Sequence, residues 1–98
     1  MTVLVPKLSN AGVSFPRLLF LKYEEFLRRL ASGHTADDAE GSWQDGGQVY
    51  RDQHRRYSVI VSSARAVDVA LQISQYVQKE FNQKAVYVEV SPIWCTEF

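Results

Sequence analysis

A glycine turn in the middle of the chain constrains the fold more than any other stretch. Residues 45–47 read Asp-Gly-Gly, with Trp43 before them and Val49 and Tyr50 after them. Glycine accepts the positive φ angles of a two-residue hairpin loop, while aromatic and β-branched residues favour strands. The stretch 41–52 is therefore predicted to form a β-hairpin between two halves that each carry a helical pattern.

Hydrophobic periodicity predicts the elements around this hairpin. Apolar residues recur at helical spacing in two segments, with charged or amide side chains on the opposite sides. In other segments they alternate with polar residues, as is typical of half-buried strands. The predicted elements are strands over 2–5, 55–62 and 85–90 and helices over 17–31 and about 66–82, with a polar loop or strand start over 34–40.

The same periodicity assigns inward-facing stripes. The stripe of the first helix is Leu19, Tyr23, Phe26, Leu27 and Leu30, and that of the second is Val67, Ala70, Leu71, Ser74, Val77 and Phe81. On the strands, Tyr57, Val59 and Val61 share one face, and the sets expected to face the helices are Val59 and Val61 with Val86, Val88 and Val90.

The order strand, helix, hairpin or strand, strand, helix, strand predicts an α+β protein. It favours a ferredoxin-like split βαβ sandwich, in which two helices cover one face of a mainly antiparallel sheet and the hairpin is an extra piece. With 98 residues, the chain is predicted to be a single α+β domain over 1–98.

The second face of such a sheet must meet water or a partner. It is expected to carry Ile60, Tyr87 and Glu89, a mixture of apolar and charged groups. Three alternatives follow: the hairpin aromatics and the tail with Trp94 cover this face, a second copy pairs with the sheet, or the face lines a ligand cavity.

Charge and cysteine content narrow the class of protein. Eleven basic and eleven acidic residues cancel, so a nucleic-acid partner is not expected. No run approaches the ~20 apolar residues that span a membrane, and the first residues lack the pattern of a signal peptide. Cys95 is the single cysteine, which fits a reducing compartment. We expect a soluble cytoplasmic protein with no membrane contact.

The downstream end of the hairpin is the strongest candidate for a binding site. Asp52, His54, Arg55 and Arg56 follow one another closely, and an arginine can grip a carboxylate or phosphate through two parallel hydrogen bonds. The alternative is a solvated stretch in which Asp52 pairs weakly with the arginines. The predicted ligand-binding set, drawn from here and the last strand, is Trp43, Tyr50, Asp52, His54, Arg56, Tyr87 and Glu89.

No stretch carries the motif of a phosphate loop, a zinc protease, a redox dithiol or a nucleophile elbow. We therefore predict no catalytic residue, no metal and no cofactor. His34 follows a helix end, where a cation favours the helix dipole, and Cys95 is expected to be a thiol without a role.

About half of the chain resembles a family. Gly41-Ser42-Trp43, the glycine turn, the strand 57–61 and Phe81-Asn82-Gln83 before the last strand are similar to small uncharacterised bacterial proteins, domains of unknown function, that have a Gly-x-Trp hairpin and a helix ending in Phe-x-Gln. The resemblance implies a bacterial source and a compact α+β fold, and it transfers no catalytic residue.

Two functional hypotheses follow. The first is a non-enzymatic homodimeric module that binds a small molecule or a protein through its sheet face or hairpin. The alternative is a small enzyme of the dimeric α/β-barrel type, with a pocket between two sheets. Its polar residues would be His54, Arg56, Tyr57, Tyr87 and Glu89.

Overall fold

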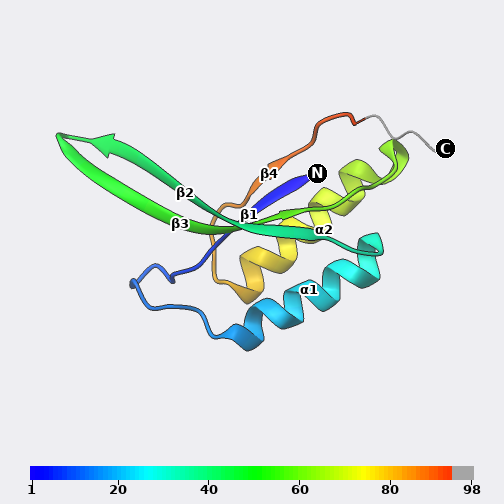
Figure 1. Ribbon diagram of the computed structural model, residues 1–98, viewed down its shortest axis with the longest axis horizontal. Coiled ribbons are helices and arrows are strands. Elements are labelled where there is room, and N and C mark those ends of the chain that lie inside the picture. Colours follow the sequence, from blue (N-terminus) through cyan, green and yellow to red (C-terminus); the bar gives the residue numbers. More distant parts are fainter. Residues whose placement is uncertain (94–98) are drawn as a thin grey trace.

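The computed structural model describes residues 1–93, so Trp94 and Cys95 lie outside the described part of the chain. Figure 1 shows two helices on one face of a sheet from which a long two-stranded ribbon extends. The elements in order are β1 (Thr2–Pro6), α1 (Arg17–Ala31), β2 (Thr35–Asp45), β3 (Gln48–Ser58), the short 3-10 helix η1 (Ser63–Arg65), α2 (Ala66–Glu80) and β4 (Tyr87–Glu89).

The four strands form one sheet in the order β2-β3-β1-β4, and every neighbouring pair is antiparallel. The predicted α+β class, with a mainly antiparallel sheet and two helices, is therefore confirmed. The strand β3 lies between β1 and β2, which α1 connects in the sequence. Similarly, β1 lies between β3 and β4, which α2 connects.

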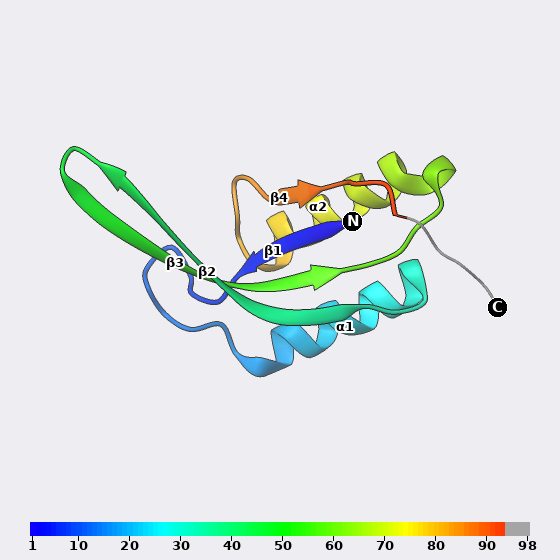
Figure 2. The same cartoon turned by 45° about the horizontal axis from the view of Figure 1, so that its top comes forward.

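The hairpin is not an extra piece, and in this respect the prediction was wrong. Its two arms are the outer ends of β2 and β3, whose register runs without a break from Thr35 opposite Ser58 to Asp45 opposite Gln48. Gly46 and Gly47 both adopt positive φ angles, +57° and +83°, as the predicted turn requires. Figure 2 shows that the resulting ribbon extends beyond β1, β4 and the two helices.

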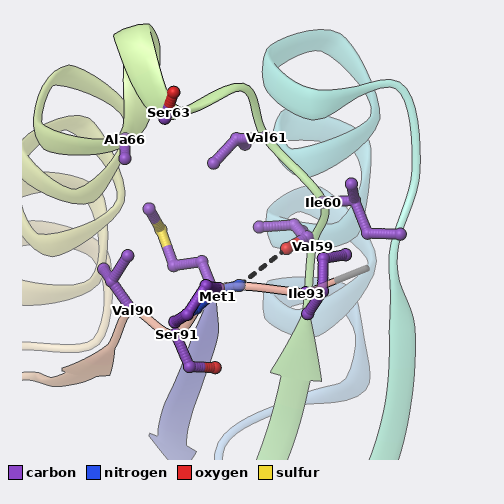
Figure 3. A pocket seen from close by; sticks show the side chains of 10 residues that line it. Met1, Val59, Ile60, Val61, Ser63, Ala66, Val90, Ser91 and Ile93 are labelled. Atoms are coloured by element: carbon purple, nitrogen blue, oxygen red, sulfur yellow. Dashed lines mark hydrogen bonds between the residues drawn. The ribbon is translucent and has the colours of Figure 1, made fainter. Parts of the chain in front are cut away.

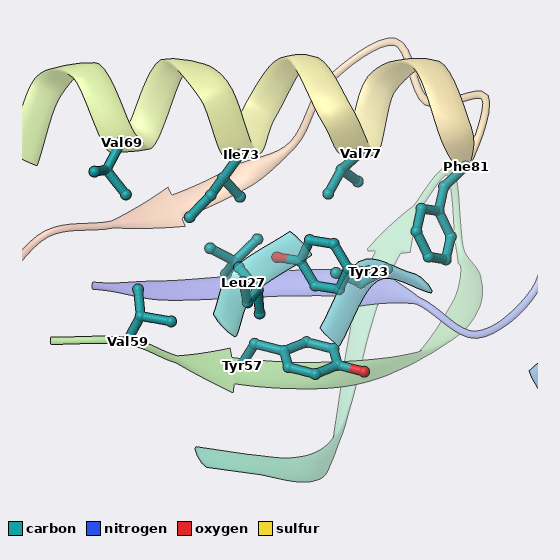
Figure 4. Packing of buried hydrophobic residues seen from close by; sticks show 10 residues of the cluster. Tyr23, Leu27, Tyr57, Val59, Val69, Ile73, Val77 and Phe81 are labelled. Atoms are coloured by element: carbon teal, nitrogen blue, oxygen red, sulfur yellow. The ribbon is translucent and has the colours of Figure 1, made fainter. Parts of the chain in front are cut away.

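The core lies between the sheet and the two helices, where side chains of α1 and α2 meet those of β1 and β3 (Figure 4). The phenyl ring of Phe81 packs edge-on against Phe15, Phe20 and Tyr23, with ring centroids 5.1 to 6.0 Å apart. The buried apolar residues are Val3, Val5, Tyr23, Leu27, Tyr57, Val59, Val69, Ile73, Val77 and Phe81.

The predicted inward stripe of α2 has the wrong register over its first half. Val67 and Leu71 are 74% and 56% exposed, whereas Val69 and Ile73 are buried. The helix carries two neighbouring apolar stripes, and both run into Val77, which is buried as expected. Residues at i and i+4 lie on one face of a helix. The stripe that packs against the sheet is the β-branched series Val69, Ile73 and Val77, which has this spacing.

The strand ends also differ from the prediction. The strand β3 ends at Ser58, and the amide of Val59 then donates to the carbonyl of Met1 at 2.9 Å. The last strand, β4, is limited to Tyr87–Glu89. Val90, predicted to face the helices, is 56% exposed because it lies beyond the pairing with β1.

Candidate binding face

The sheet has one face toward the helices and one face that no described element covers, which we call the helix-free face. Alternate residues of a strand point to opposite faces, and Val3, Val5 and Tyr57 point into the core. Residues on the opposite side, matched across the strands by the register, form the helix-free face: Thr2, Leu4, Pro6, Thr35, Asp37, Ala39, His54, Arg56, Ser58, Tyr87 and Glu89.

The centre of this face is a cross-strand ion pair. Nε of Arg56 donates to Oδ1 of Asp37 at 2.9 Å, and Nη2 bonds to the other carboxylate oxygen. This hydrogen bonding holds the pKa of Asp37 below its ordinary value and raises the pKa of Arg56. Both side chains are about half exposed. The guanidinium fork of Arg56 therefore has a partner within the chain, and an external anion would have to compete with Asp37.

Apolar groups continue the same row. Leu4 lies opposite Arg56 on one side and opposite Tyr87 on the other. Tyr87 is 56% exposed, and its hydroxyl donates to Oε2 of Glu89 at 3.1 Å. That hydrogen bond to a carboxylate raises the pKa of Tyr87. Tyr87 and Glu89, both predicted site residues, thus lie together on an exposed surface of the sheet.

The ribbon carries the other aromatic members of the predicted set. Trp43 and Tyr50 face each other across β2 and β3, and their rings stack with centroids 4.3 Å apart. The indole Nε1 of Trp43 donates to Oδ2 of Asp52 at 3.0 Å. Because the ribbon projects away from the sheet (Figures 1 and 2), these rings do not lie over the sheet, as one alternative had proposed. They belong to the same side of the strands as His54 and Arg56 by unbroken alternation.

The structure separates the arginines that were expected to act with Asp52. Arg56 lies on the helix-free face, while Arg55 points to the other side and donates to Oδ1 of Asp38 at 3.1 Å. Asp52 accepts from Trp43 rather than from an arginine. Asp37 and Asp38 were not predicted as the partners of these arginines. The register set by the glycine turn would have identified them, since it places Asp37 opposite Arg56.

The position of Tyr57 rules out a single pocket lined by all five residues of the enzyme hypothesis. Its ring is buried in the core, on the opposite side of β3 from His54 and Arg56. Its hydroxyl donates to Oε2 of Glu24 at 3.0 Å. Burial, followed by this hydrogen bond, raises the pKa of Tyr57. The five side chains therefore do not converge within one chain.

A second polar cluster lies on the helix side and was not foreseen. Oε1 of Glu24 is 3.6 Å from Nε2 of His34, whose Nδ1 is buried without a hydrogen-bond partner among residues 1–93. Nearby, Lys7 and Arg55 both form ion pairs with Oδ1 of Asp38, and these three residues border a hollow of about 490 Å³. His34 thus packs beside a carboxylate of α1, in addition to following the end of that helix.

An apolar hollow of about 390 Å³ lies beyond the end of the sheet, between the segments that follow β3 and β4 and beside Met1, which precedes β1 (Figure 3). Met1, Val59, Val61 and Val90 line much of it, and the amino group of Met1 donates to the carbonyl of Val59 at 2.9 Å. No predicted site residue borders it. Its lining is mostly apolar and contains no acidic, basic or histidine side chain.

Comparison with known protein families and with curated proteins gave no match. The resemblance to small bacterial proteins therefore stays a prediction. Among residues 1–93, no helix is long and apolar enough to cross a membrane, and no group of three or more potential ligand side chains is placed to hold a metal ion.

Proposed function

We propose that this chain is a non-enzymatic, homodimeric binding module of the ferredoxin-like type, and that the helix-free face and its ribbon form the interface. The proposal includes a cytoplasmic location in a bacterial cell. The strand order supports the ferredoxin-like assignment, because each helix joins two strands that have a third strand between them, as in a split βαβ arrangement.

The observation that supports this interface is the set of residue types that share one side of the strands. Trp43, Tyr50, Arg56 and Tyr87 all belong to that side, and these are the residue types that interfaces favour and that most often dominate binding energy. The two ribbon aromatics are 50% and 38% exposed although they stabilise no core. Apolar and aromatic side chains that gather on one exposed face commonly mark an interaction site.

A two-fold dimer would bury both the helix-free face of the sheet and the aromatic rings of the ribbon. In a two-fold dimer the same patch is used by both copies. With the helix-free faces opposed, the ribbon of one protomer would reach across the partner, and its stacked rings would cover the partner's Leu4 and the partner's Tyr87. The 50 Å longest extent of the molecule gives the ribbon that reach.

Light scattering of the full chain tests this proposal. We expect a mass twice that of one chain, and a return to the monomer mass in the variant Trp43→Ala/Tyr50→Ala, whose substitutions lie outside the core. The matched control is Val67→Ala/Leu71→Ala, which removes exposed apolar groups from α2 and should leave the dimer intact. A monomeric wild-type chain at high concentration, or a ribbon variant that dimerises like the wild type, would refute it.

A further inference from the structure

The outer edge of the sheet carries a second surface, separate from the helix-free face. The strand β2 is eleven residues long and is the last strand on its side of the sheet. In an antiparallel pair, alternate residues of each strand direct their N–H and C=O groups away from the partner. Within residues 1–93, no backbone hydrogen bond joins β2 to any element except β3. A row of donors and acceptors is therefore open along this edge.

The usual protections against strand pairing are few on β2. Natural edge strands are blunted by short length, proline, a bulge or charged side chains, lysine above all. The opposite edge follows this rule, because β4 has three residues and Pro92 comes shortly after it. In contrast, β2 has no proline, no lysine and no break in its register. The long edge is thus protected only by its acidic side chains, which disfavour another acidic strand but not a basic one.

Charge decides which strand β2 would accept. The strand carries Asp37, Asp38, Glu40 and Asp45 and no basic residue. Asp37 and Asp38 are paired with side chains outside β2, whereas Glu40 and Asp45 make no ion pair within residues 1–93. Two copies joined edge to edge would set these carboxylates against one another, which is unfavourable for groups directly opposite. A strand rich in lysine or arginine would instead meet a carboxylate on either face.

Gly41, in the middle of β2, has no structural role within the described part of the chain. Its φ angle is not in the left-handed region, and a Cβ built on it would meet nothing within 4 Å. Neither backbone geometry nor packing within residues 1–93 therefore requires glycine here. A glycine inside a strand commonly marks a place where another backbone or a ligand comes close.

From these observations we infer that β2 is a docking edge for an extended basic segment of a partner protein, which would pair with it as an added strand. Main-chain hydrogen bonds would supply much of the affinity in this mode, and side chains would supply the selectivity. The docking edge is formed by backbone groups in the plane of the sheet, whereas the proposed dimer contact is made by side chains that point away from its helix-free side.

Fluorescence anisotropy with labelled synthetic peptides tests the inference. The probe is a capped Lys-Val repeat of about eight residues, a usual strand length. Its controls are a Lys-Pro repeat of equal charge, which lacks half of the N–H donors, and a Glu-Val repeat. We expect saturable binding of the Lys-Val peptide to the full chain with a Kd below about 1 mM, and binding at least about tenfold weaker for both controls. Hydrogen exchange should show new protection within residues 36–44.

Matched variants locate the site. Glu40→Lys should raise the Kd of the Lys-Val peptide about threefold or more, because it replaces an exposed attraction between Glu40 and a peptide lysine by a repulsion. Glu80→Lys makes the same change of charge at the end of α2 and should leave the affinity nearly unchanged. Equal affinity for the Lys-Pro peptide, equal effects of the two variants, protection outside β2, or no binding at all would each overturn the inference. None of these outcomes depends on whether the chain dimerises.

Discussion

The hydroxyl of Tyr57 donates a hydrogen bond to Oε2 of Glu24 at 3.0 Å and so joins β3 to α1 at the margin of the core. Tyr57 is buried and Glu24 is partly buried. Tyr57→Phe would keep the ring and leave the carboxylate without this donor. We expect the free energy of unfolding to fall by about 1 kcal/mol, measured by urea denaturation.

Tyr87→Phe is the control for that variant, because its hydroxyl also donates to a glutamate but on an exposed surface. Its effect on the monomer should stay within about 0.5 kcal/mol. Measurements at low protein concentration avoid a contribution from the dimer interface. Equal losses in the two variants would show that the Tyr57 bond is worth no more than a surface contact.

The register of α2 gives a second prediction. Ile73 is buried and Leu71 is 56% exposed, although the two residues are near neighbours on the same helix. Ile73→Ala should cost about 2 to 5 kcal/mol, because it leaves a cavity against the sheet. Leu71→Ala should change stability by less than about 0.5 kcal/mol. Chemical denaturation of both variants checks this, and the reverse order would mean that the other stripe of α2 faces the core.

The ribbon should open independently of the rest of the molecule. The side chains of residues 40–53 are exposed and contribute nothing to the core cluster, and such regions open at low free-energy cost. Trp43→Ala removes the stack with Tyr50 and the hydrogen bond to Asp52. Hydrogen exchange should accelerate within residues 41–52 and stay slow in β1. Acceleration throughout the sheet would show that the ribbon is part of one cooperative unit.

The ion pair on the helix-free face predicts a dependence on pH. The hydrogen bond from Arg56 lowers the pKa of Asp37 from its ordinary value of 3.8. A carboxyl group whose pKa is lower in the folded state stabilises the fold above its unfolded pKa, and this contribution is lost as the pH falls toward the folded value. Thermal denaturation between about pH 5 and pH 2 should therefore show a shallower decline for Asp37→Asn than for the wild type. Parallel curves would mean that Asp37 has the same pKa in both states.

Local patterns were enough to predict much of the fold. The limits of α1 were predicted to the residue, since its amphipathic pattern has no competing interpretation. The turn was correct because two adjacent glycines allow few other structures. In contrast, α2 has two apolar stripes, and periodicity alone does not reveal which one the sheet covers.

The strand register places the seven predicted site residues on one side of the strands, which the sequence pattern had not shown, and two of their neighbours, Asp37 and Asp38, were not predicted as partners. Arg56 was chosen for its proximity in sequence to Asp52, yet its partner is Asp37, which lies across the sheet. Sequence proximity is a poor guide within a strand, because neighbouring residues point to opposite faces. Counting outward from the glycine turn would have given the cross-strand partner, and it would also have shown that Tyr57 and Arg56 do not share a pocket.

The most direct test of the dimer is a filtered NMR experiment on a mixture of ¹³C-labelled and unlabelled chains, which detects only contacts between copies. The proposed dimer predicts intermolecular signals between the ring protons of Trp43 in one copy and the methyl groups of the partner's Leu4. Intermolecular signals confined to Val67 and Leu71 of α2, or none under conditions where the mass is that of a dimer, would contradict it.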